Sequence, residues 1–152
     1  MNEIIKSEKT VALDEVARRA AELLEVYGTL VDHLPEELPT GQLAHHRVEL
    51  ADALERLTTA RRQDGELPVA GDLEHAQWKS LGVRLRALLA EGSEATALAR
   101  ETLAECEALG ERIAVARQFD LSPAIADALQ TMTERLAEQA RGLRVLAEIG
   151  AA

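Results

Sequence analysis

Apolar residues recur along most of the chain in alternating steps of three and four, the spacing that places side chains on one face of an α-helix. The pattern predicts four long helices, at about residues 9–34, 41–63, 94–118 and 123–148, and a shorter one at about 72–90. The apolar seams of the four long helices are Leu13, Val16, Ala20, Leu23, Tyr27, Leu30 and Leu34; Leu43, His46, Leu50, Leu54 and Leu57; Leu98, Thr102, Cys106, Leu109, Ile113 and Ala116; and Ile125, Leu129, Met132, Leu136, Gln139, Leu143, Leu146 and Gly150.

Helix breakers and capping residues separate these segments. Pro35 and Pro39 end the first long helix, and the turn at Gly65 ends the second. Ser122 is the expected N-cap of the last helix, with Pro123 at the first helical position, where a missing N–H costs nothing.

Composition and connection lengths then predict the fold class. Hydrophobic residues make up 47% of the chain but aromatic residues only 2%, and most of the apolar residues are the helix formers Ala and Leu. The two outer connections between long helices are short, whereas the middle one spans about 30 residues and can cross the length of a bundle. We therefore expect residues 1–152 to form one all-α domain, a ferritin-like four-helix bundle with a short extra helix in its long crossover.

The charge balance excludes several kinds of partner. Seventeen Lys and Arg against 27 Asp and Glu give a formal charge of −10, so neither nucleic acid nor an anionic membrane surface is an expected partner. No apolar window is long enough to span a bilayer, and the first residues do not resemble a signal peptide, so we expect a cytoplasmic protein. A single cysteine, Cys106, cannot close an internal disulfide.

Two stretches resemble an uncharacterised bacterial ferritin-like family, a domain of unknown function. Residues 65–81, GELPVAGDLEHAQWKSL, resemble its crossover segment, in which a Gly- and Glu-rich turn precedes a short helix with a central Trp, here Trp78. The sequence Leu121-Ser-Pro123 resembles the Leu-Pro-Pro that opens the last helix of the family, and the acidic helix containing Cys106 is also similar. The resemblance covers roughly residues 40–148 and implies a ferritin-like bundle. Di-iron oxidation and iron storage, known in that superfamily, are implied only where the metal ligands are present.

Most of the ligands of a di-iron site are missing. Such a bundle needs an inward Glu on each of two helices and a Glu-x-x-His pair on each of the other two, but the sequence contains no Glu-x-x-His. On the first helix Tyr27 is the only polar residue of the seam, and Glu15, Glu22 and Glu25 are expected on the solvent side. The remaining candidates for a mononuclear metal site are His46, Glu105 and Gln139.

Each candidate also has a purely structural interpretation. His46 can be a buried core histidine, Glu105 a solvated residue of an acidic face, and Gln139 a buried polar group that fixes helix register. Two hypotheses follow. The first is a non-enzymatic bundle without a cofactor that self-associates or docks on a protein partner, its metal site decayed. The alternative is a ferritin-like oxidoreductase or storage protein that binds iron or manganese through a reduced ligand set.

Apolar residues outside the main seams favour a homodimer, because a monomer would expose them to water. They are Val26, Val31, Val83, Leu89, Leu103, Val115 and Val145.

Overall fold

The computed structural model describes residues 7–33, 40–65 and 95–151, and nearly all of them are helical. The helices are α1 (Glu8–His33), α2 (Thr40–Gln63), α4 (Ala95–Ala116) and α5 (Pro123–Ala151). The predicted all-α four-helix bundle is confirmed, and each boundary lies within three residues of its predicted position. The short helix predicted at about 72–90 lies outside the described residues.

Local interactions fix two of the helix ends as the sequence predicts. The backbone N–H of Ile125 donates to Ser122 Oγ at 3.3 Å, and α5 begins at Pro123, so Ser122 is the N-cap. After α2, Gly65 adopts a φ of 83°, in the left-handed region that closes many helices and that suits glycine.

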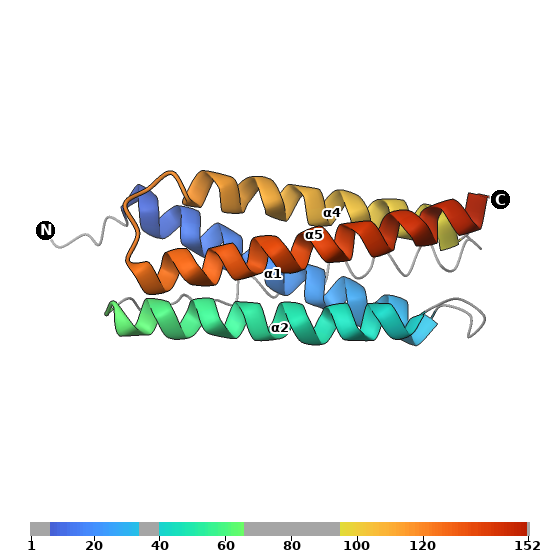
Figure 1. Ribbon diagram of the computed structural model, residues 1–152, viewed down its shortest axis with the longest axis horizontal. Coiled ribbons are helices and arrows are strands. Elements are labelled where there is room, and N and C mark those ends of the chain that lie inside the picture. Colours follow the sequence, from blue (N-terminus) through green and yellow to red (C-terminus); the bar gives the residue numbers. More distant parts are fainter. Residues whose placement is uncertain (1–6, 34–39, 66–94, 152) are drawn as a thin grey trace, which may run out of the picture.

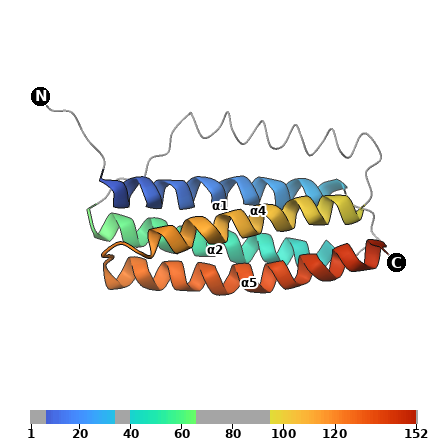
Figure 2. The same cartoon turned by 90° about the horizontal axis from the view of Figure 1, so that it is seen from above.

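The helices form a ring in the order α1, α2, α5, α4, and each contacts the two beside it. Figures 1 and 2 show that neighbouring helices are antiparallel, whereas α1 and α5, which lie diagonally opposite, run in the same direction. The other diagonal pair, α2 and α4, is also parallel, so α2 ends at one end of the bundle and α4 begins at the other (Figure 1). This is the helix order of a bundle with one long connection between its second and third long helices.

The predicted seams supply most of the core. Their buried apolar members include Leu13, Val16, Leu23, Leu30, Leu50, Leu57, Leu98, Leu109, Ile113, Ile125, Leu129, Met132 and Leu143. Together they form one continuous cluster along the bundle.

The buried arc of α1 is wider than a single seam, and this corrects two expectations. Val26, predicted outside the seam, is only 2% exposed. Glu22, expected in solvent, is also buried, and it accepts a 2.8 Å hydrogen bond from Arg18 Nη1. Both results arise because α1 is flanked by α2 on one side and α4 on the other. Val31 and Leu103 are half-buried against the same core.

An ion pair joins α1 to α2 inside the bundle. Arg61 Nη2 lies 2.8 Å from Asp14 Oδ1, and the two side chains are 1% and 18% exposed. In the sequence Arg61 is simply one of a pair of arginines near the end of a helix. None of the helices in the described ranges is both long enough and apolar enough to cross a membrane.

Candidate functional site

Four polar side chains, one from each helix, meet in the middle of the apolar core. They are Tyr27 of α1, His46 of α2, Cys106 of α4 and Gln139 of α5, and we call them the polar layer. None is more than 7% exposed. All four occupy seam positions predicted from the sequence, so the three-and-four spacing of each helix explains why they point inward.

Tyr27 interacts with each of the other three residues of the layer. Its hydroxyl donates to Gln139 Oε1 at 2.7 Å and lies 3.2 Å from Cys106 Sγ. Because the single phenol proton is used on Gln139, the Cys106 thiol is the donor in the second contact. Burial raises the pKa of Cys106 to about 11, and it raises the pKa of Tyr27 by a larger amount. Both groups are therefore protonated at neutral pH.

Gln139 connects three helices. Its Oε1 accepts from Tyr27, and its Nε2 donates to the backbone carbonyl of His46 at 3.4 Å. The Gln139 amide thus contacts the main chain of α2 and not the His46 imidazole. The amide therefore fixes the register of α2 and α5 and leaves the imidazole unsatisfied.

The His46 ring is held by packing rather than by hydrogen bonds. It lies 6.1 Å from the Tyr27 ring, centroid to centroid, at an interplanar angle of 49°. Both ring nitrogens are buried and neither has a hydrogen-bond partner. Burial lowers the pKa of His46, an effect opposed by the carboxylates of Glu49 and Glu138, so the imidazole is neutral at neutral pH.

The third candidate ligand, Glu105, belongs to a different environment. Its side chain is 22% exposed, and Oε2 lies 3.9 Å from Arg19 Nη1 across the α1–α4 contact. The structure thus brings His46 and Gln139 together and places Glu105 beside a cation. Sequence reasoning missed the role of Tyr27, although its isolated hydroxyl on an otherwise apolar seam was a usable signal.

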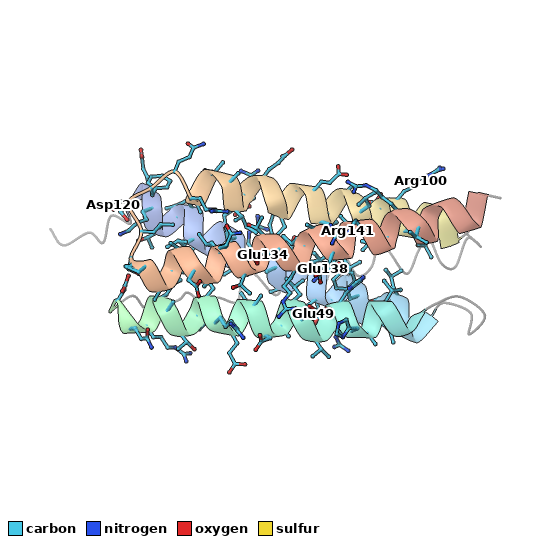
Figure 3. The ribbon with its side chains drawn as sticks, in the orientation of Figure 1. Glu49, Arg100, Asp120, Glu134, Glu138 and Arg141 are labelled. Atoms are coloured by element: carbon cyan, nitrogen blue, oxygen red, sulfur yellow. The ribbon has the colours of Figure 1, made fainter. Side chains whose placement is uncertain are left out.

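A carboxylate near the layer, Glu49, is also paired. Glu49 accepts a hydrogen bond from Arg135 on α5, and its Oε1 lies 2.5 Å from Nε2 of the exposed His45. Figure 3 labels Glu49 on α2 and Glu138 on the neighbouring α5. Within the residues that the structure describes, no group of three or more His, Cys, Asp or Glu side chains could hold a metal ion. The donor set of the polar layer, without a carboxylate, does not fit a di-iron centre.

A groove at one end of the bundle is the second notable feature. It is lined by α1, α4 and the turn after α4, and we call it the α1–α4 groove. Its lining residues are Glu8, Val11, Ala12, Glu15, Arg112, Val115 and Phe119. Val11 is 53% and Val115 45% exposed. Glu8 and Arg112 border the groove, and neither forms an ion pair within the described part of the chain.

Comparison of the chain with protein-family models, with curated proteins and with solved structures gives no significant match.

Proposed function

We propose that this chain is a non-enzymatic helical bundle that associates with a second copy of itself, and that its polar layer is a decayed ferritin-like metal site. The α1–α4 groove carries the proposal, because its exposed valines are apolar surface that association would remove from water. Val145, on α5, is 52% exposed and is a further apolar residue at the surface, outside the groove.

The chemistry of the polar layer supports the second half of the proposal. Hard dications such as Fe²⁺ and Mn²⁺ prefer carboxylate oxygens, and at neutral pH the side chains of the layer carry no negative charge. Tyr27 occupies the inward position of α1 at which a metal centre would require a carboxylate. Leucine and alanine packing with one internal hydrogen-bond chain can then hold the bundle together without an ion.

Charge complementarity supports a second copy of the chain as the occupant of the groove. Glu8 and Glu15 lie on the α1 side of the groove, and Arg112 lies on the α4 side. A twofold axis running lengthwise between α1 and α4 places α1 of each copy on α4 of the other. Glu8 then faces Arg112 of the other copy, and valines face valines, whereas Glu15 is already paired with Arg18 and Arg19 of its own helix. A twofold axis across the helices would instead place α1 on α1 and bring like charges together.

Sedimentation of valine variants tests the association. We expect the wild type at tens of micromolar to sediment at twice the chain mass of 16.5 kDa. Val115→Glu puts a charge into the groove and should give monomers, whereas Val48→Glu, at a valine of α2 that is 67% exposed, is the matched control and should leave the dimer intact. A wild-type monomer at these concentrations, or equal effects of the two variants, would refute the proposed interface.

Charge exchange tests the direction of the twofold axis. Arg112→Glu and Glu8→Arg should each weaken the dimer, and the double variant should restore it because the opposite charges again face each other across the interface. A double variant weaker than either single variant contradicts this arrangement. Circular dichroism melting of every variant shows whether the monomer remains folded.

A further inference from the structure

The outer side of α1, which faces away from the bundle axis, is covered along its middle. Because an α-helix turns about 100° per residue, two residues that are nine positions apart lie on opposite sides of it. Arg18 stands nine residues before the fully buried Tyr27, yet its side chain is only 22% exposed. Ala21 stands nine residues before the fully buried Leu30 and is itself half-buried. Thr29, also on the outer side, is 8% exposed.

The outer sides of the other three helices are open to solvent. Val48 of α2, Glu107 of α4 and Val145 of α5 each stand nine residues from a buried leucine of the core. Their exposed fractions are 67%, 59% and 52%. Each of these helices also has two neighbours in the ring, so flanking helices do not cover the outer side of a helix. These exposures are those of a single chain, and the cover of α1 therefore belongs to the chain itself.

Only one of the stretches outside the described residues is long enough to supply this cover. Residues 1–6 span at most about 21 Å when fully extended, whereas Thr29 lies about 33 Å along the helix from Ser7. They would also have to pass Val11, which is 53% exposed. Residues 34–39 join α1 directly to α2, so they cannot also reach back to Arg18. Residues 66–94 are the remaining long stretch, and they must run the length of the bundle, because α2 ends at one end and α4 begins at the other (Figure 1).

The helix order leaves two paths for this connection. Because α2 and α4 lie diagonally opposite in the ring, the connection passes over either α1 or α5. The outer side of α5 is exposed and that of α1 is covered. The helix predicted at about 72–90 is about 28 Å long, and its apolar seam needs a surface to pack on. That seam consists of Trp78, Leu81, Leu85 and Leu88. On α1, Ala21 and the aliphatic stem of Arg18 offer such a surface.

We propose that the outer side of α1 is the docking surface of the crossover segment, residues 66–94, which passes over α1 and not over α5. Of the residues on this side, Val11 and Glu25 are exposed, so the segment does not enclose the helix and leaves its N-terminal end open. The α1–α4 groove lies at that open end. The docking of the segment and the association of two copies therefore use different parts of α1.

Nitroxide quenching of Trp78, the only tryptophan, tests this path in the full chain. A nitroxide label quenches tryptophan fluorescence only at short range, so it reports which helix Trp78 lies beside. Glu25→Cys on α1 and Glu134→Cys on α5 are matched sites, because both glutamates are exposed on the outer side of their helix. Cys106 is 3% exposed and does not compete for the label. Relative to the chemically reduced label, we expect the nitroxide at Glu25→Cys to remove more than half of the emission and that at Glu134→Cys to leave it unchanged.

Quenching from Glu134→Cys, or from neither site, would overturn the proposal. Mixing labelled Glu25→Cys protein with unlabelled wild type separates the two possible sources of quenching. The emission of the wild type stays unchanged if the contact lies within one chain, and its loss would assign the contact to a second copy.

A charge placed under the segment provides an independent test. Ala21→Glu should shift the emission of Trp78 to longer wavelength and increase its quenching by acrylamide, because a buried carboxylate opposes docking. Ala104→Glu is the matched control, since Ala104 is exposed on the outer side of α4, nine residues before the buried Ile113. It should leave both measurements unchanged. Equal effects of the two variants, or no effect of Ala21→Glu, would contradict the docking surface.

Discussion

The buried ion pair between Asp14 and Arg61 ties the first two helices together at one end of the bundle. With its side chain 1% exposed, Arg61 has lost nearly all of its hydration, and the carboxylate 2.8 Å away compensates for part of that loss. Removing one member of such a pair leaves a buried charge that is poorly compensated, whereas removing both can be nearly neutral.

We therefore expect Asp14→Asn to lower the free energy of unfolding by about 3 kcal/mol. The double variant Asp14→Leu with Arg61→Met should recover most of this loss, because no charge then remains buried. Urea unfolding followed by circular dichroism measures both values. A loss below about 0.5 kcal/mol in Asp14→Asn would show that the pair behaves like an exposed one.

His46 should make the stability depend on pH. Its pKa is lowered in the folded protein, so the unfolded chain takes up the proton first as the pH falls below about 6.5. Stability is then unaffected above this pH and decreases below it, by at most about 1.4 kcal/mol per pH unit. The titratable groups around the imidazole are Tyr27 on α1, His45 and Glu49 on α2, and Glu138 on α5.

Urea titrations at pH 7.5 and 5.5 measure this effect. His46→Gln, which cannot titrate, should lose less stability between the two pH values than the wild type does. His45→Gln is the matched control, since its imidazole is 70% exposed, and it should behave like the wild type. The same pH dependence in His46→Gln and the wild type would assign the effect to other groups.

Individual side chains were predictable only as far as their helical face. The seams place Tyr27, His46, Cys106 and Gln139 inward, and all four are inward. Which of them touch depends on the relative shift of the four helices, and no pattern within one helix contains that shift. Arg61 was not predictable because a charged residue at the edge of a helix face is usually solvated, and the pairing that allows its burial comes from another helix.

The glycines within helices offer a test of helix propensity. Gly110 lies inside α4, and a Cβ added there would meet nothing within 4 Å. Because glycine in a helix interior is less favourable than alanine, Gly110→Ala should raise the free energy of unfolding by about 0.8 kcal/mol.

Gly28 of α1 provides the comparison. A Cβ there would lie 3.3 Å from the guanidinium of Arg47, so Gly28→Ala should gain less than Gly110→Ala unless that exposed side chain moves aside. Thermal melting of both variants measures the difference. A Gly110→Ala protein less stable than the wild type would contradict the open space at this position.

The four long helices were predictable because each carries its own periodic seam and its own end signals, such as Ser122 and Gly65. The width of the buried face of each helix was not predictable, as the burial of Val26 and Glu22 shows. A helix with neighbours on two sides buries an arc wider than one seam, and the identity of those neighbours depends on tertiary structure.

The arrangement of the four helices in a ring determines which kind of ion the polar layer could hold. Because α1 and α5 face each other across the bundle, as do α2 and α4, side chains at one level come from all four helices and converge on the bundle axis. A carboxylate at the level of Tyr27 would make this level suitable for a hard cation. A phenol there instead forms a hydrogen bond and closes the core, so the bundle should fold without any divalent metal.

Thermal melting with and without excess EDTA, beside elemental analysis of untagged protein, tests that independence. We expect a melting temperature that EDTA does not change and no stoichiometric iron or manganese, because the apolar cluster and the Tyr27–Gln139 hydrogen bond form without an ion. His46→Leu should leave the fold intact for the same reason. A decrease of more than about 5 °C with EDTA, corresponding to about 1 kcal/mol or more for a chain of this size, would favour a bound divalent ion. Stoichiometric iron or manganese that is lost in His46→Leu would place that ion in the polar layer and make the iron- or manganese-binding hypothesis the better one.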